Sequence, residues 1–326
     1  MEEIRRTLRD SKGARWFALA VISFTMLCGY YLTDGMAPLK PLLEKELAWS
    51  SSEYGFFTSA YGWFNVFLLM LIFGGIILDK MGVRFTGRMA TIIMVIGTSI
   101  KYWAISTHSL DGLHFLGMKA QVVVAGLGFA TFGVGVEVAG ITVSKIIVKW
   151  FKGKEMALAM GLEMATARIG TTLAMATSIP IAEALHGVSK PVLVCLIMLV
   201  IGMIAFFLYT IMDKKLDESV AEEMVRSGNT VDEEAFRVSD IWVILRNRGW
   251  WYIAILCVLF YSAVFPFLKY ATDLMVNKFG IDEKLAGNIP AMLPFGTILL
   301  TPFFGNLYDR KGKGASIMIL GALLLI

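Results

Sequence analysis

The sequence predicts an all-α membrane protein, and three features of the chain support this fold class. Of its 326 residues, 57% are hydrophobic and only 17% are charged, which is far more apolar than a soluble domain. Apolar runs of about 20 residues, the length that a helix needs to cross a bilayer, recur along the whole chain. Most charged residues lie between these runs. We therefore expect a bundle of transmembrane helices.

Nine apolar segments are expected to form these helices, and short charged loops separate them. The predicted spans are, in chain order, 16–38, 53–78, 89–106, 116–148, 156–182, 191–212, 250–276, 285–308 and 315–326. The first eight are of full length. The ninth ends with the chain at Ile326, after twelve apolar residues, so we expect a sequence that is truncated at its C-terminus.

The basic residues of the loops predict the orientation. Of 30 Lys and Arg residues, 21 lie in the N-terminal segment and in the loops on the same side, and only 6 lie in the opposite loops. By the positive-inside rule, the N-terminus is predicted to be cytoplasmic. The net charge of +4 follows from this topological bias. We therefore expect a lipid bilayer and no nucleic acid among the partners.

The chain shows no pattern of an enzyme or of a metal site. Its cysteines lie far apart inside apolar segments, and its histidines lie in or near the loops opposite the N-terminus, without metal-ligand spacing. These residues are Cys28, Cys195 and Cys257, and His108, His114 and His186. Catalytic motifs are also missing from the sequence. We expect neither catalysis nor a cofactor.

A change of composition divides the chain. The stretch 213–248 is strongly charged and separates a six-helix half, 1–212, from a second part, 249–326, that holds spans 7, 8 and part of 9. This stretch is predicted to be a cytoplasmic linker. Its section 217–223 fits either a short surface helix or solvated chain.

Two loops of the chain are related by sequence. After the second span the chain reads GIILDKMGVR, Gly75 to Arg84, and after the eighth it reads GNLYDRKGKG, Gly305 to Gly314. Both fit G-x-x-x-D-[KR]-x-G, and they are 230 residues apart. The two parts of the chain therefore look like copies, as in transporters built from parallel repeats of six spans.

The motif resembles the signature loop of the major facilitator superfamily, G-x-x-x-D-R-x-G-R-R, between spans 2 and 3 and again between spans 8 and 9. One departure is Val83, which stands where the family has an arginine. The resemblance implies the major facilitator fold, with two six-helix halves related by pseudo-twofold symmetry, the second half truncated in this chain.

This loop predicts a gate. A glycine allows close helix approach, and an aspartate at a helix end can pair with a basic residue, so the contacts can form and break as the halves move. The gating candidates are Gly75, Asp79, Lys80, Gly82 and Arg84 in the first copy, and Gly305, Asp309 and Arg310 in the second. The alternative is an ordinary turn that only sets the topology.

Ionisable residues inside the spans are the candidates for a site, because burying one in a membrane costs roughly 2.5–3.5 kcal/mol. Glu137 lies 12 residues before Lys149 at one end of span 4, and Arg168 lies 14 residues after Lys154 in span 5. At 1.5 Å per residue, their depths differ by roughly 3 Å. We expect Glu137 and Arg168 to meet near mid-membrane, with Glu163 on another face of span 5.

Two interpretations of this pair remain open. The pair could only position spans 4 and 5, or it could bind a zwitterion, with Arg168 on a carboxylate and Glu137 on an ammonium group or a proton. Lys269 and Asp273 in span 7 either complete the site or form a salt bridge at a helix end. Tyr30 and Tyr31 in span 1 either line the cavity or pack.

A closer resemblance covers about 20 residues. The run KWFKGKEMALAMGLEMATARIG, Lys149 to Gly170, resembles the facilitator family that contains the lysosomal dipeptide transporter, whose members carry WFKGKE followed by a SMARIG-type motif. The resemblance implies that Arg168 holds the C-terminal carboxylate of a peptide and that Glu137 holds its N-terminal ammonium. The chain has no N-x-[ST] site and no acidic dileucine signal, so we expect a bacterial inner-membrane member.

The sequence thus predicts a transporter of small peptides, most of all dipeptides, that works by alternating access. A proton-coupled transporter of small carboxylates is one alternative, and a membrane receptor or assembly subunit without transport is another. The expected partners are a dipeptide or another small zwitterion or carboxylate, the lipid bilayer and protons.

Overall fold

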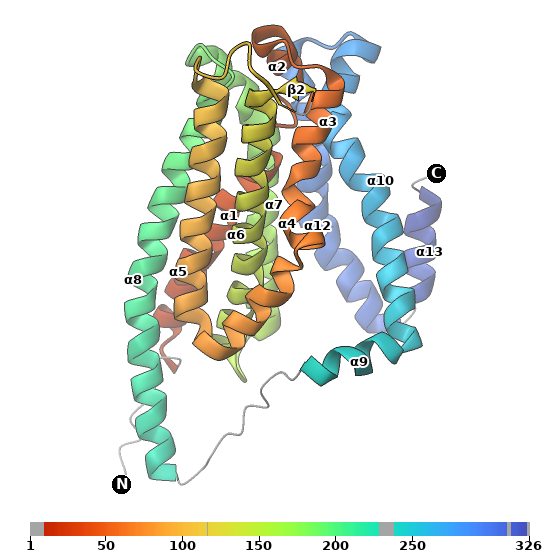
Figure 1. Ribbon diagram of the computed structural model, residues 1–326. Helices are drawn as coiled ribbons and strands as arrows, with labels where there is room; N and C mark the ends of the chain where they lie inside the picture. The colour runs from red at the N-terminus through yellow and green to blue at the C-terminus, as the bar shows by residue number, and fades with distance from the viewer. Residues whose placement is uncertain (1–9, 116, 228–237, 312–313, 325–326) are drawn as a thin grey trace.

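The computed structural model describes residues 10–115, 117–227, 238–311 and 314–324 (Figure 1). Nearly all of them are helical. The longer helices are α1 (Lys12–Asp34), α5 (Met70–Ser106), α6 (Ala120–Phe151), α7 (Met156–Ala184), α8 (Lys190–Ser227), α10 (Arg248–Phe279), α12 (Asn288–Lys311) and α13 (Gly314–Leu324). The shorter elements are α2 (Lys40–Leu47), α3 (Ser51–Ser59), η2 (Ala60–Gly62), α4 (Trp63–Phe67), α9 (Val238–Arg246), α11 (Glu283–Ala286) and the hairpin of β1 (His114–Phe115) with β2 (Met118–Lys119).

Every predicted span contains helix. Among the described residues, the five helices α1, α5, α6, α8 and α10 are long and apolar enough to cross a membrane. The bundle has two ends, which we call the N-side, where α1 begins, and the distal side, where α1 ends and where α2, α11 and the β-hairpin lie (Figure 1). The predicted orientation places the N-side in the cytoplasm.

The second span is not the continuous helix that its apolar run predicts. It consists of α3, the 3₁₀ turn η2, α4 and the first part of α5, with a break at Leu69, which has a φ of 53°. The signature loop then falls inside α5, at Gly82, with a φ of 74° and a ψ of 172°. Only a residue without Cβ adopts this conformation readily, so Gly82 allows the sharp turn from span 2 into span 3.

Glycines bring α5 and α6 into backbone contact. A Cβ atom on Gly128 would lie 2.6 Å from the amide nitrogen of Lys101, and one on Gly135 would lie 2.7 Å from that of Met94. Small residues at a helix interface allow this approach, which is how helices associate where lipid supplies no hydrophobic driving force. On another face of α6, Gly133 lies against the carbonyl oxygen of Tyr61. Helix α6 is thereby placed between α5 and the broken second span.

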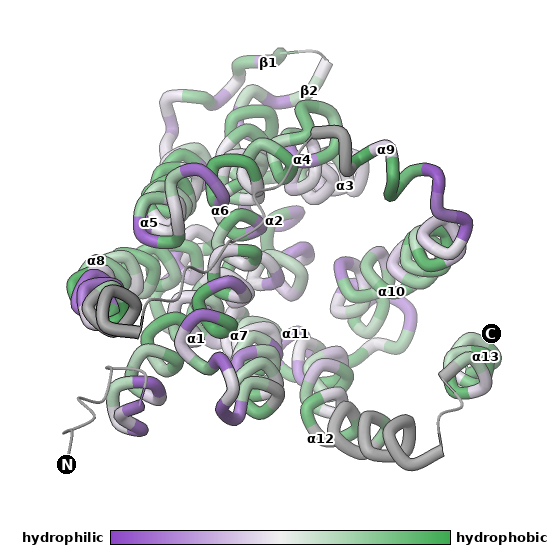
Figure 2. Tube along the Cα trace, turned by 90° about the horizontal axis from the view of Figure 1, so that it is seen from below, coloured by the Kyte–Doolittle hydropathy of each residue, from purple (hydrophilic) through white to green (hydrophobic). Residues whose placement is uncertain are grey.

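The second part of the chain meets the first mainly at the distal side. The buried residues of α10 are Leu268, Ala271 and Thr272, all in its distal half, whereas its N-side half is exposed. Seen along the bundle, α10, α12 and α13 form a group beside the first helices (Figure 2). Helix α8 runs past residue 212 to Ser227, so the first section of the predicted linker is helical.

Candidate functional site

Glu137 lies on α6 and is bound by a residue of the broken second span. The hydroxyl group of Tyr61, in η2, donates a hydrogen bond of 2.6 Å to Glu137 Oε1. Gly133, one turn before Glu137, makes room for the Tyr61 backbone. The break in span 2 and the small residue in α6 therefore work together to place the hydroxyl on the carboxylate. Tyr61 is not among the residues predicted from the sequence, where its only signal is a tyrosine inside an apolar segment.

Arg168 lies on α7 and is half-buried. Within the described part of the chain, its guanidinium group forms no hydrogen bond or ion pair, and none joins it to Glu137. The salt bridge that would only position spans 4 and 5 is therefore absent between these two described residues. A partly exposed guanidinium without an anion can bind a carboxylate of a ligand with two parallel hydrogen bonds.

Tyr30 lies among the charges of the site. The charges of Glu137 and Arg168 both act on its hydroxyl, and that of Glu163 acts more weakly. Tyr30 is half-buried on α1, as expected of a residue at the edge of a cavity. Three helices, α1, α6 and α7, thus bring an acid, a guanidinium and a phenol into one region. The similar depth that the sequence predicts for Glu137 and Arg168 stays a prediction.

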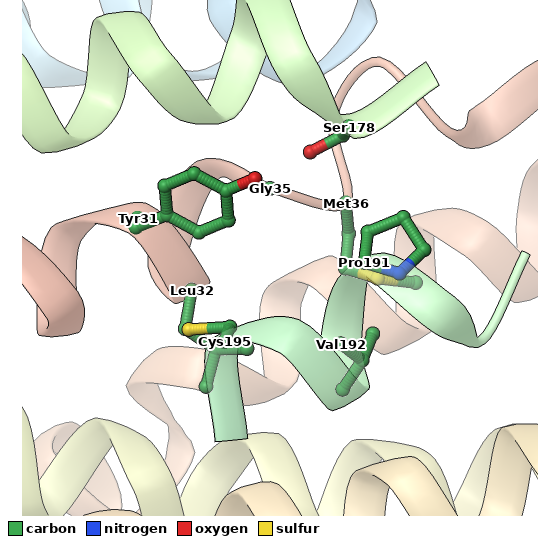
Figure 3. A pocket seen from close by; sticks show the side chains of 8 residues that line it. All are labelled: Tyr31, Leu32, Gly35, Met36, Ser178, Pro191, Val192 and Cys195. Carbon is green, nitrogen blue, oxygen red and sulfur yellow. The ribbon is translucent and has the colours of Figure 1, made fainter. Parts of the chain in front are cut away.

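Tyr31 points elsewhere. Its hydroxyl lies 2.7 Å from Thr177 Oγ1 on α7, and its ring borders a small cavity with Ser178 and Cys195 (Figure 3). This cavity has a volume of about 10 Å³, which is room for one water molecule at most. Consecutive helical residues lie about 100° apart around the axis, so the two tyrosines point in different directions. Of the two alternatives for Tyr31, the structure shows packing.

Glu163 is buried on a face of α7 different from that of Arg168. It shares this face with Ala167 and Gly170, and a Cβ on Gly170 would lie 2.5 Å from the carbonyl oxygen of Leu27 in α1. The face is therefore the one that packs on α1. The structure agrees with the expectation that Glu163 and Arg168 do not act side by side.

Lys269 and Asp273 form no salt bridge with each other. Lys269 Nζ lies 2.9 Å from Asp34 Oδ1 on α1, and Asp273 Oδ1 lies 2.9 Å from Lys40 Nζ on α2. Each residue therefore binds the first half of the chain, at the distal side. Of the two alternatives for these residues, the structure does not show the salt bridge at the helix end, because opposite charges on α1 and α2 face this stretch of α10.

The charges of the first signature loop pair with residues of α6 and α8. Asp79 Oδ1 lies 2.8 Å from Lys145 Nζ on α6, and Arg84 Nη1 lies 2.9 Å from Asp217 Oδ2 on α8. Lys80 is exposed. Asp213, fully buried beside this cluster, accepts hydrogen bonds from Lys149, Trp150 and Tyr209. These contacts tie α5, α6 and α8 together on the N-side.

Two further gating predictions have different outcomes. Gly75 was expected to allow close helix approach, but its position is open, and the close contact is made by Gly74, where a Cβ would lie 2.5 Å from Val138 Cγ2. The apolar run gave no means of telling which glycine faces α6. In the second copy, Gly305, Asp309 and Arg310 belong to α12, but their side chains lie outside what the structure describes.

Comparison with known proteins identifies similar chains. The family profile described as Major Facilitator Superfamily matches residues 19–326. The lysosomal dipeptide transporter MFSD1 of Bos taurus is 26% identical over 313 residues, which cover 92% of this chain and 62% of that protein. The galacturonate transporter of Dickeya chrysanthemi is 25% identical over 256 residues, covering 75% of this chain and 67% of that protein.

A solved structure shows the same fold. The xylose transporter XylE from E. coli superposes with a TM-score of 0.64 at 15% sequence identity, covering 92% of this chain and 74% of that one. The chain spans less than two thirds of the length of the dipeptide transporters that it matches. Each of these relatives is named as a transporter and none as an enzyme, in agreement with the expectation from the sequence.

Proposed function

Because this chain belongs to the major facilitator superfamily, we propose that it forms part of an alternating-access transporter of small peptides, most of all dipeptides. The observation that carries the proposal is the half-buried guanidinium of Arg168, which has no partner among the residues that the structure describes and lies in the same region as the Tyr61–Glu137 hydrogen bond. A cation and an anion that do not neutralise each other suit a ligand that carries both charges.

The chemistry of binding follows from the groups present. The planar fork of Arg168 matches the geometry of a peptide carboxylate, and Glu137 can accept hydrogen bonds from the ammonium group at the other end. Tyr61 holds one oxygen of Glu137 and leaves the other for the ligand. Free amino acids carry the same charges closer together, so a preference for dipeptides would come from the separation between Glu137 and Arg168.

The conformation is consistent with alternating access. The second part of the chain contacts the first at the distal side, whereas the N-side half of α10 is exposed. With the N-terminus in the cytoplasm, we propose that this is the inward-facing state. The signature-loop contacts of Asp79 and Arg84 would then hold the first half rigid while the second half moves against it.

A second candidate is a proton-coupled transporter of small carboxylates. The similarity to a galacturonate transporter favours it, and Arg168 could bind such an anion alone. In that case Glu137 would carry the proton instead of a ligand ammonium group. The two candidates differ in whether Glu137 contacts the substrate.

Thermal stabilisation of the purified protein by ligands separates these candidates. A ligand at 100 times its Kd stabilises the native state by about 2.7 kcal/mol, which raises the unfolding temperature measurably. We expect dipeptides to stabilise the protein, single amino acids and galacturonate to have little effect, and both Arg168→Lys and Glu137→Gln to abolish the shift. Stabilisation by simple acids that survives Glu137→Gln would favour the carboxylate transporter. Stabilisation by these ligands that is unchanged in Arg168→Lys would overturn both candidate functions.

A further inference from the structure

The distal contact between α10 and the first half contains two ion pairs of opposite polarity. The first half contributes an acid, Asp34, and then a base, Lys40, whereas α10 contributes a base, Lys269, and then an acid, Asp273. Both pairs join parts of the chain that are more than 230 residues apart. Neither pair is explained by the substrate site.

Asp34 is held from both halves. Lys269 Nζ donates to Asp34 Oδ1 at 2.9 Å and to the carbonyl oxygen of Thr33 at 2.6 Å. Thr171 Oγ1, on α7, donates to Asp34 Oδ2 at 2.8 Å. The Asp34 side chain is only 7% exposed. A carboxylate so deeply buried needs these partners, because a buried charge left without them costs several kcal/mol.

Lys40 completes the second pair at the start of α2. Its side chain is 3% exposed, and its Nζ lies 2.9 Å from Asp273 Oδ1 and 2.7 Å from Glu44 Oε1. Burial disfavours its charge, but the hydrogen bonds to Glu44 and Asp273 outweigh this effect, and the pKa of Lys40 is raised above its ordinary value. The ammonium group is thus held charged at the interface between the halves.

A buried tyrosine lies between the two ion pairs. Tyr54, on α3, is fully buried and donates a hydrogen bond of 3.0 Å to the carbonyl oxygen of Lys269. Its ring meets that of Tyr270 edge to face, with 5.4 Å between the centroids. The contact is therefore a closed interface with polar groups satisfied across it, which is how specific interfaces are built.

The alternating charges fix the register of α10. Lys269 and Asp273 are four residues apart, about 6 Å along the helix, and lie on the same face. A slip of one turn in one direction would place Asp273 against Asp34, and a slip in the other would place Lys269 against Lys40. Like charges at a buried interface repel strongly, so only one register closes the contact.

We propose that Asp34–Lys269 and Lys40–Asp273 form the distal gate of this protein, and that their crossed polarity selects the single register in which the second part of the chain closes on the first. Opening toward the distal side must break both pairs. The gate is adjacent to the substrate site, because Asp34 is one turn from Tyr30 on α1 and Thr171 is one turn from Arg168 on α7.

Distances between spin labels across the distal side test this proposal without any substrate, so its outcome is independent of the peptide hypothesis. Exposed Ser109 and Lys278, at the distal ends of the two parts, are replaced by cysteines and labelled after Cys257→Ser removes the exposed native thiol. We expect one short distance for this background. Lys269→Asp should add a longer distance. Asp34→Lys combined with Lys269→Asp should restore a short but broader distance, because each side then carries charges of one sign and the register is no longer fixed.

A matched control lies on the same side of the molecule. Lys284 and Glu183 also bridge the two parts, at 3.3 Å, but their side chains are 67% and 36% exposed. Because exposed pairs contribute little, Lys284→Glu should leave the distance unchanged. If Lys269→Asp does not fold, the neutral Lys269→Met gives the same comparison. An unchanged short distance in the folded Lys269 variants, or no restoration in the double variant, would overturn the proposal.

Discussion

Arg168 and Glu137 lie on neighbouring helices in the membrane, yet no hydrogen bond or ion pair joins these two described residues. Glu137 takes the hydroxyl of Tyr61, and the guanidinium stays unpaired among the described residues. A residue that is costly to bury and is not neutralised by its nearest opposite charge is poorly explained by the fold alone. The site therefore contains two opposite charges that do not bind each other, and the hydroxyl of Tyr61 orients one of them, Glu137.

Tyr61→Phe tests that orientation. The substitution removes the hydrogen bond to the Glu137 carboxylate and little else, and hydrogen bonds to charged groups contribute about 1.5–3 kcal/mol. We expect dipeptide affinity, measured by calorimetry, to fall about tenfold or more. Tyr31→Phe is the matched control, because its hydroxyl bonds Thr177 away from the site, and it should leave affinity unchanged. Equal effects of the two variants would exclude the role given to Tyr61.

Helices α5 and α6 are packed against each other through glycines. Their glycines are spread along an apolar segment, and the contact that they form is between backbones, with Gly128 against Lys101 and Gly135 against Met94. Such contacts tolerate no added atom, since neither backbone can move without shifting its whole helix. The position of the broken second span also depends on α6. Tyr61 reaches Glu137 because α6 has a glycine, Gly133, where the backbone of Tyr61 packs against it.

Gly128→Ala should therefore destabilise the protein. The new Cβ would lie 2.6 Å from a backbone nitrogen, so the helices must separate, and overpacking of this kind costs about 1–3 kcal/mol. Gly161→Ala, at an open position of α7, should be neutral or slightly stabilising, because alanine favours helix. Thermal unfolding in detergent measures both. A Gly128→Ala protein as stable as the parent would show that α5 and α6 are less tightly packed.

At the scale of the whole molecule, the two ends of the bundle differ in how the parts of the chain meet. The distal side is closed by ion pairs between the two parts, whereas the N-side pairs that we describe, around Asp79 and Asp213, join α5, α6 and α8. Alternating access requires such an asymmetry, and it requires a defined orientation in the membrane. The distribution of basic residues predicts that orientation.

Labelling of single cysteines in intact cells measures the orientation of the protein in the membrane. In the Cys257→Ser background, Ser109→Cys lies on the distal side and Lys80→Cys on the N-side, and both positions are exposed. With 21 of 30 basic residues on the N-side, we expect a membrane-impermeant thiol reagent to modify Ser109→Cys only. Modification of Lys80→Cys alone would reverse the orientation and make this conformation outward-facing.

Hydropathy, loop charge and the repeated motif were enough to predict the membrane setting, the order of the spans and the superfamily, because each depends on local sequence and on the bilayer. The constant rise of a helix also gave a predicted depth for Arg168 and Glu137. These arguments concern one helix at a time. They could not show that span 2 breaks near Tyr61 or that Gly74 rather than Gly75 meets α6.

Which charges pair depends on how the helices pack against one another. Lys269 and Asp273 look like an ion pair in the sequence because they are four residues apart, but each binds a residue that is more than 230 positions away. The choice depends on where α10 packs against α1 and α2, and on which partner better compensates the free energy of burying each charge. That balance is a property of the assembled helices, and no single segment contains it.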